Sequence, residues 1–237
     1  MQNYVDKYLG DNKQSKFDAY LEKTRQKYVL RSANLRSHKH ILDIGGGVST
    51  YFAFIKNWDT YTIIEPVEQF SKYLKEFYDD YQIEMICDRF ENTRLKQDYD
   101  FIVVSSVLHL VEDVDKFLTT LHDVCNYKTI IYINVPNKVS FHRLLGEKMG
   151  MLYSMSSLSS RDVEFSHKHT FDRKRLWECL SRNGFNVIVQ GSYLIKPFDE
   201  EKMSQIVDED VVDGLEKMIS YFPDMGCEIY AEAKSIG

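Results

Sequence analysis

The sequence predicts one α/β domain built on a mostly parallel, doubly wound sheet of seven strands with helices on both faces. Its 237 residues suit a single compact domain. Short apolar runs alternate with helical segments between residues 38 and 137, which is the rhythm of right-handed βαβ units. The first apolar run ends in three glycines, as expected of a tight turn that lets a ligand approach the backbone.

The predicted elements follow one another in a regular order. Residues 1–37 are expected to be helical, with aromatic side chains scattered among charged ones. Apolar runs predict strands at 40–44, 60–66, 82–88, 98–110, 128–137, 186–194 and 227–234. Helices are predicted over 48–57, 67–81, 114–125, 140–152, 171–185 and around 203–221.

The alternation stops after Pro136, where residues 138–170 start as a helix and become polar and serine-rich. We expect them to form a small helical lid over the carboxyl edge of the sheet. Met149, Met151, Tyr153 and Met155 would cover a substrate there or simply pack. The domain then consists of an N-terminal helical lid (1–37), a cofactor-binding core (38–137), the lid insertion (138–170) and a C-terminal completion of the sheet (171–237).

Composition argues against several classes of function. A net charge of −6 disfavours nucleic acid as a partner, so a small molecule is the expected ligand. No apolar run approaches the roughly 18 residues of a membrane span, and the first residues lack the apolar core of a secretory signal. The four cysteines are far apart, so we expect no metal site, no disulfide framework and a cytoplasmic location.

The glycine turn is the strongest local signal for a cofactor. Asp43 ends the first predicted strand and is followed by Gly45, Gly46 and Gly47. Glu65 lies 22 residues after Asp43, at the end of the next strand, where an acidic residue commonly binds a ribose. A tight connection without any ligand is the alternative interpretation of the glycines alone.

This turn resembles the first motif of class I S-adenosylmethionine-dependent methyltransferases, hydrophobic-Leu-Asp-x-Gly-x-Gly. Asp43, Gly45 and Gly47 match it, and Ser49 stands where a third glycine is common. A dinucleotide site more often keeps Gly-x-Gly-x-x-Gly to hold a pyrophosphate. The pattern therefore favours a nucleoside cofactor without phosphates.

The resemblance continues along most of residues 38–137, through three further motifs that end in VLHLVED. It implies a Rossmann-like fold and S-adenosyl-L-methionine as cofactor, with S-adenosyl-L-homocysteine as product. Glu65 matches the ribose-binding acid, Asp88 the residue that accepts from adenine, and the two serines of the fourth strand the segment beside the methionine. The implied cofactor residues are Asp43, Gly45, Gly46, Gly47, Glu65, Pro66, Asp88, Arg89, Phe90, Ser105 and Ser106.

Histidines are the candidates for a catalytic base, because imidazole titrates near physiological pH. His109 follows the fourth strand, His142 lies in the predicted lid helix, and His167 precedes the next helix together with His169. The position of His109 at the carboxyl end of a strand favours it. Each histidine could instead have a packing or capping role.

Residues 134–185 resemble a subset of small bacterial methyltransferases that modify surface glycans and other sugar-containing metabolites. This implies methyl transfer to an oxygen of a sugar, a sugar nucleotide or a sugar-linked group. Three other acceptors stay open: an amine nitrogen, a phosphate-type oxygen and a quinone-precursor ring. A non-catalytic domain that binds the cofactor as a sensor or interaction module is a further alternative. The aromatic N-terminal helices form either a lid or a homodimer surface.

Overall fold

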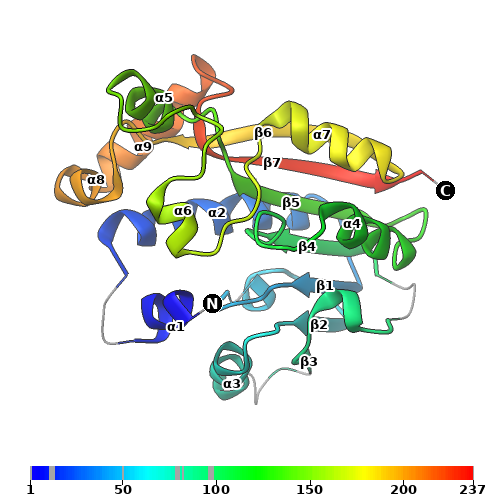
Figure 1. The fold of residues 1–237 in the computed structure, drawn as a ribbon. Coiled ribbons are helices and arrows are strands. Elements are labelled where there is room, and N and C mark those ends of the chain that lie inside the picture. The colour runs from blue at the N-terminus through cyan, green and yellow to red at the C-terminus, as the bar shows by residue number, and fades with distance from the viewer. Residues whose placement is uncertain are drawn as a thin grey trace.

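The computed structural model describes residues 2–10, 14–49, 51–77, 81, 83–95 and 99–236. It confirms the predicted α/β architecture with one sheet of seven strands in the order β3-β2-β1-β4-β5-β7-β6 (Figure 1). The strands are β1 (His40–Ile44), β2 (Thr60–Ile64), β3 (Ile83–Ile86), β4 (Phe101–Ser105), β5 (Ile130–Pro136), β6 (Phe185–Ile195) and β7 (Gly226–Ser235).

Strands β1 to β5 pair in parallel, whereas β7 runs antiparallel to both β5 and β6. The carboxyl ends of β1 to β5 therefore meet at one edge of the sheet. Crevices outside such an edge are where ligands bind in open α/β sheets. The register fixes this edge closely, since Ile44 lies opposite Ile64 of β2 and Val104 of β4.

The helices in the described part of the chain cover both faces. They are α1 (Gln2–Leu9), α2 (Lys16–Asn34), α3 (Glu68–Phe77), α4 (Val114–Asp123), α5 (Phe141–Lys148), α6 (Ser160–Glu164), α7 (Arg173–Arg182), α8 (Glu200–Ile206) and α9 (Glu209–Lys217), with 3-10 turns η1 (Tyr51–Ala53), η2 (Phe90–Asn92) and η3 (Met218–Ser220). Helices α4 and α7 pack on one face, and α2, η1 and α3 on the other. A third core lies beneath α8 and α9.

The helix predicted over residues 48–57 is the clearest difference from expectation. Apart from Thr50, which lies outside the described residues, the segment contains only the 3-10 turn η1. Tyr51 and Phe52 are each 3% exposed, so their rings are anchored in the core, where Phe52 meets Tyr61 edge to face. Asn57 then takes a left-handed φ of 61°, which ends any helical course. Aromatic and β-branched residues also favour a helix only weakly.

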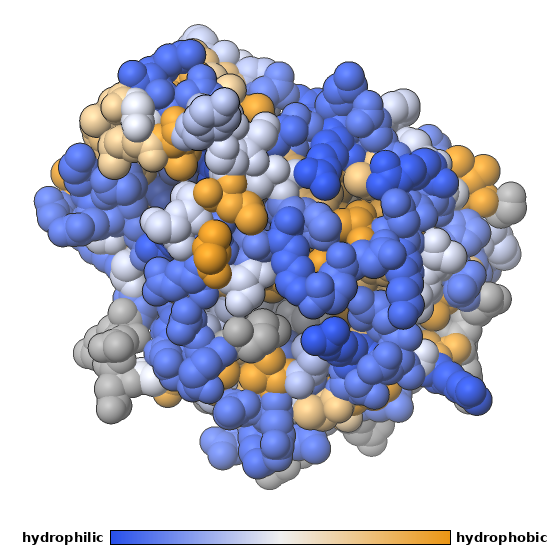
Figure 2. Space-filling view, in the orientation of Figure 1, coloured by the Kyte–Doolittle hydropathy of each residue, from blue (hydrophilic) through white to orange (hydrophobic). Residues whose placement is uncertain are grey.

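Two other predicted segments need refinement. The single helix expected around 203–221 is divided into α8, α9 and η3, because Asp208 starts a new helix by accepting a hydrogen bond from the amide of Val211. In the lid insertion, Met149, Met151 and Tyr153 are exposed rather than folded over a substrate. Apolar surface is visible over the α5 region in Figure 2.

Helices α1 and α6 lie together at the carboxyl edge of the sheet, although 150 residues separate them (Figure 1). The Asn3 side chain donates to the carbonyl of Glu164 at 2.7 Å, and the Tyr4 ring meets Phe165 edge to face at 5.1 Å. These contacts place the N-terminal segment over the strand ends. No helix of the described residues is both long and apolar enough to cross a membrane.

Candidate active site

A cavity of about 410 Å³ opens at the carboxyl edge of the sheet. Its floor comes from the loops after β1, β2 and β4, and its upper walls come from α1, α2 and the segment after α6. The lining residues are Tyr4, Tyr8, Glu22, Arg25, Ile44, Gly45, Gly46, Gly47, Val48, Ser49, Ile64, Glu65, Pro66, Phe70, Arg89, Phe90, Glu91, Ser105, Ser106, Val107, Leu110, Val111, Glu112, Phe117, Ser166 and Lys168.

The glycine loop forms the centre of this cavity wall. Gly45 has a φ of 76°, and a Cβ atom there would lie 2.3 Å from Cγ2 of Val107 in the loop after β4. Gly47 has a φ of 56°, in the same left-handed region. Glycine is therefore required at position 45 both for its conformation and for close packing between two loops.

Glu65 fixes the glycine loop from the end of β2. One carboxylate oxygen accepts from the amide of Gly47 at 2.9 Å and the other from the amide of Val67 at 2.8 Å. The residue is 4% exposed, and burial raises its pKa despite these hydrogen bonds. An acidic group thus lines the cavity at the position predicted for ribose recognition.

Asp43 lies beneath the loop and not in the cavity wall. It is 1% exposed and accepts from the Tyr61 hydroxyl at 3.0 Å through Oδ2. Its Oδ1 has no hydrogen-bond partner among the described residues. Burial raises the pKa of Asp43 to about 7. The direct cofactor contact expected from the sequence therefore gives way to a buried position under the turn.

The loop after β3 presents the neighbours of Asp88 rather than Asp88 itself. Asp88 is exposed, and its Oδ1 accepts from the amide of Arg89 at 2.7 Å and the side chain of Asn92 at 3.1 Å. Arg89 and Phe90 line the cavity, and Phe90 also packs on Phe117 at 5.2 Å. The carboxylate of Asp88 thus stabilises the turn that positions these two side chains.

Ser105 and Ser106 line the cavity at the end of β4. The Ser105 hydroxyl lies 3.1 Å from the Tyr51 hydroxyl. Ser106 has a left-handed φ of 58°, and its amide donates to the carbonyl of Asn134 at 3.0 Å. This turn directs the chain after β4 across the cavity floor.

None of the three histidines predicted as bases lines the cavity, and His109 and His142 are the two that lie away from its wall. His109 is 2% exposed, and burial lowers its pKa well below the usual value, so the ring is neutral. Its carbonyl accepts from the amides of Lys168 and His169, which makes it an anchor for that segment. His142 lies on α5 with Nδ1 3.1 Å from the Ser140 hydroxyl, and burial also lowers its pKa well below the usual value.

His167 lies just behind the cavity wall. Its Nδ1 is 3.1 Å from Oδ1 of Asp162, and its Nε2 is 3.3 Å from the Tyr4 hydroxyl. Tyr4 lines the cavity, so His167 reaches it through this phenol. His167 is therefore one side chain removed from the cavity.

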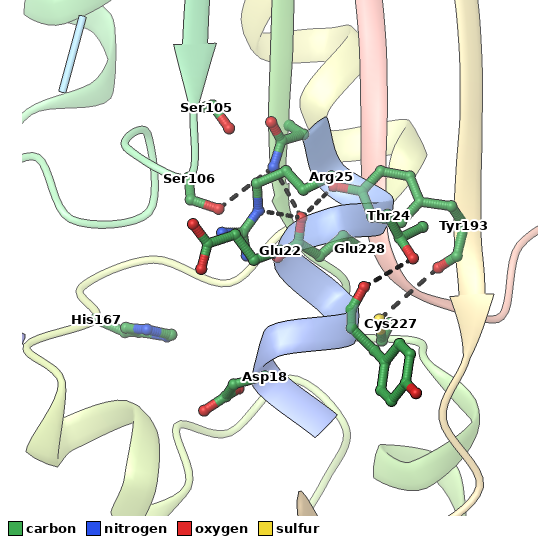
Figure 3. Close-up of polar contacts among 12 residues, drawn as sticks. Asp18, Glu22, Thr24, Arg25, Ser105, Ser106, His167, Tyr193, Cys227 and Glu228 are labelled. Atoms are coloured by element: carbon green, nitrogen blue, oxygen red, sulfur yellow. Dashed lines mark hydrogen bonds and ion pairs between the residues drawn. The ribbon is translucent and has the colours of Figure 1, made fainter. Parts of the chain in front are cut away.

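A buried polar network closes the side of the cavity formed by α2. Glu228 of β7 is 3% exposed and accepts from the Arg25 guanidinium, the Tyr193 hydroxyl and, at 2.8 Å, the Asn134 amide. The Asn134 amide also lies 3.3 Å from the Ser106 hydroxyl. Figure 3 shows the side chain of Arg25 reaching from α2 to the carboxylate of Glu228.

The sequence predicted an N-terminal helical lid over residues 1–37 but did not indicate which of its residues line the cavity. Tyr4, Tyr8, Glu22 and Arg25 all line the cavity. The one available signal was the spacing of Asp18, Glu22 and Arg25, which places three charged residues on one helix face (Figure 3). Such a face is ordinarily solvated, and only the fold turns it toward the strand ends.

Asp43 should make the stability of the protein without cofactor depend on pH. Its raised pKa means that folding favours the protonated carboxyl, so stability is complete below the ordinary pKa and falls as the pH rises toward about 7. At pH 8 the free energy of unfolding of Asp43→Asn, measured with urea, should therefore exceed that of wild type by about 2–4 kcal/mol. At pH 4 the two proteins should not differ in this way. Asp59→Asn, at an exposed position, is the control. An Asp43→Asn effect that is constant from pH 4 to 8 would contradict the assignment.

The residues around the cavity fit an S-adenosylmethionine molecule. The left-handed glycines bring the backbone to the cavity, Glu65 offers carboxylate oxygens, and Phe90 and Phe117 provide an apolar wall. Of the three lining cations, Arg25 and Lys168 are paired with Glu228 and Glu112, and Arg89 has no ion pair among the described residues.

Comparisons with known proteins agree with this fit. Among solved structures, an S-adenosylmethionine-dependent methyltransferase from Mesorhizobium loti has a TM-score of 0.65 and 14% identity, with 90% of this chain and 99% of that chain covered. The N-methyltransferase NodS from Bradyrhizobium japonicum, bound to S-adenosyl-L-homocysteine, has a TM-score of 0.60 and 11% identity, with coverage of 98% and 93%. The plantazolicin methyltransferase BamL, also with that product, has a TM-score of 0.63 and 16% identity, with coverage of 100% and 94%.

No curated protein sequence matches the chain significantly. A family model described as a methyltransferase domain matches residues 17–190, which is most of the chain. The protein therefore belongs to the methyltransferase domain family and is an S-adenosylmethionine-dependent methyltransferase.

Proposed function

We propose that this methyltransferase methylates a hydroxyl oxygen of a small polar acceptor, a sugar or a sugar-linked metabolite. In this proposal Glu65 binds the ribose of the cofactor, Arg89 and Phe90 flank the adenine, and Ser105 and Ser106 lie along the methionine part. The glycine loop, which Asp43 supports from beneath, lets the cofactor approach the backbone.

The polar end of the cavity carries the proposal. The polar side chains that line it include Glu22 and Arg25 of α2, Ser166 and Lys168 after α6, and Tyr4 of α1. Hydroxyl-rich acceptors need many hydrogen-bond partners when they leave water, and this end of the cavity offers both donors and acceptors. The volume of the whole cavity, about 410 Å³, is in the range of small-molecule sites.

The chemistry required of the protein is modest. The bound cofactor supplies a methyl group already activated on a sulfonium. The chain must hold the acceptor in line, exclude water and take up the proton that the hydroxyl loses. The roof formed by α1 and the segment after α6 supports the second requirement, because Tyr4 joins the two through Phe165.

An amine acceptor is the second candidate, and Glu22 favours it. Its carboxylate lines the cavity and accepts from the Gln14 side chain at 2.8 Å, but it has no ion-pair partner among the residues that the structure describes. An unpaired carboxylate attracts an ammonium group. The N-methyltransferase NodS is consistent with this chemistry on the same fold. A phosphate-type acceptor would find Arg25 and Lys168 already paired with carboxylates, which leaves Arg89 as the lining cation without an ion pair among the described residues.

The cofactor assignment predicts that Glu65→Gln weakens binding of S-adenosyl-L-homocysteine at least 10-fold in calorimetric titration. An amide would turn one of the two acceptor oxygens into a donor, facing the backbone N–H of Gly47 or Val67, and would remove the charge that binds ribose hydroxyls. Glu68→Gln, on the exposed face of α3, should bind as wild type does. Equal affinity in the two variants would remove Glu65 from the site.

The acceptor assignment is tested with a panel of hexoses, sugar nucleotides, amino sugars and polyamines. Wild-type enzyme with labelled S-adenosylmethionine should release product with a hydroxyl acceptor, and mass spectrometry should locate the methyl group on oxygen. Methylation only on nitrogen would establish the second candidate instead. Failure of the entire panel to support turnover would count against a sugar or amine acceptor altogether.

A further inference from the structure

We propose that Tyr4, His167 and Asp162 form a proton relay, in which the Tyr4 hydroxyl contacts the acceptor hydroxyl and passes its own proton to His167. This inference rests on the proposed function, because an alcohol needs a base whereas a neutral amine does not. It makes Tyr4 a catalytic residue that none of the sequence motifs indicates.

The three groups come from separate segments and form a continuous chain. Tyr4 lies on α1 and lines the cavity, and its hydroxyl is 3.3 Å from Nε2 of His167. Nδ1 of the same ring is 3.1 Å from Oδ1 of Asp162, on α6. The chain thus leads from the cavity to a carboxylate outside it, as in a nucleophile-histidine-carboxylate arrangement.

The surroundings of Asp162 fix the direction of proton movement. Burial would raise the pKa of Asp162, but hydrogen bonds from His167, Ser159 and Arg143 outweigh it and hold the pKa well below its usual range. Arg143 donates at 2.9 Å, and the amide and hydroxyl of Ser159 at 2.8 Å each. Asp162 is therefore an ionised acceptor, so Nδ1 of His167 carries the ring proton.

With the ring proton on Nδ1, Nε2 of His167 presents its lone pair to the Tyr4 hydroxyl at 3.3 Å. Burial raises the pKa of Tyr4 above its usual range, so its hydroxyl stays protonated and donates to this nitrogen. The phenol is then ready to give up one proton and accept another in the same event. Asp162 acts through His167 and is a positioning residue.

The packing around the ring holds this arrangement in place. His109 meets His167 edge to face with ring centroids 4.3 Å apart, and its buried ring stays neutral beside it. The amide of His167 donates to the carbonyl of Asp162 at 2.8 Å. Phe165, two residues before His167 in the chain, packs edge to face against the Tyr4 ring. The histidine favoured from its sequence position thus supports the relay from outside the cavity.

The proposed step balances in protons and electrons. The acceptor oxygen forms the new bond to the methyl carbon, while the bond from that carbon to sulfur breaks and leaves its electron pair on sulfur. The acceptor proton moves to the Tyr4 oxygen, and the original Tyr4 proton moves to Nε2 of His167. The imidazolium so formed pairs with the Asp162 carboxylate and later releases its proton to solvent.

Turnover of Tyr4→Phe with the hydroxyl acceptor identified by the panel tests the relay. The substitution keeps the ring that packs on Phe165 but removes the proton carrier, so kcat should fall about 100-fold. Affinity for S-adenosyl-L-homocysteine should stay within threefold of wild type, which reports an intact cavity. Tyr127→Phe removes an exposed phenol far from the relay and should leave kcat unchanged.

Nitrogen NMR of the histidine rings gives a readout that needs no acceptor. Wild type at pH 8 should show His167 protonated on Nδ1 and unprotonated on Nε2, with the signals assigned by their loss in His167→Gln. The Nε2 signal should shift in Tyr4→Phe, and the Nδ1 tautomer should lose its dominance in Asp162→Asn.

A proton on Nε2 in wild type, or full turnover of Tyr4→Phe on a hydroxyl acceptor, would overturn the relay while leaving the proposed function intact. Wild-type enzyme that methylates only amines would instead overturn the proposed function, and with it the need for a relay.

Discussion

The buried carboxylate of Glu228 is the constraint on which the α2 side of the cavity depends. A charge that is 3% exposed must be paired and hydrogen-bonded, and here the partners come from α2, β5 and β6. Pairing with Arg25 draws α2 across the strand ends and turns Glu22 toward the cavity. The Asn134 amide extends the same network to the Ser106 hydroxyl. The Glu228 carboxylate, on the antiparallel strand β7, thereby links α2 to the cavity floor.

The two ends of the cavity follow different physical rules. At the cofactor end, backbone geometry dominates: left-handed glycines, a close approach to Val107 and the two hydrogen bonds that Glu65 accepts make a rigid turn. At the proposed acceptor end, side chains from α1, α2 and the segment after α6 line the cavity although they are far apart in the sequence. Backbone geometry at the glycine loop is thus combined with a proposed acceptor end that depends on a few side-chain contacts.

The strands, their number and the glycine turn could be predicted from the sequence because they depend on local apolar runs and on φ values that glycine alone adopts easily. Glu65 could be placed by its distance along the chain from Asp43. The contributions of Tyr4 and Arg25 could not, since Arg25 meets Glu228 across 203 residues. His109 was favoured because it follows a strand, yet proximity to a strand end does not specify whether a side chain enters the cavity or the core. The prediction of a helix after the glycines was wrong for a related reason. Burial of Tyr51 and Phe52 in the core takes the place of the regular helix that was expected there.

Calorimetric titration of the purified protein with S-adenosyl-L-homocysteine and, separately, with NAD tests the central claim most directly. The cavity built on the glycine loop and Glu65 predicts micromolar binding of the nucleoside product and no binding of the dinucleotide. Binding of NAD in the absence of any binding of S-adenosyl-L-homocysteine would contradict the assignment of this cavity to a methyl donor.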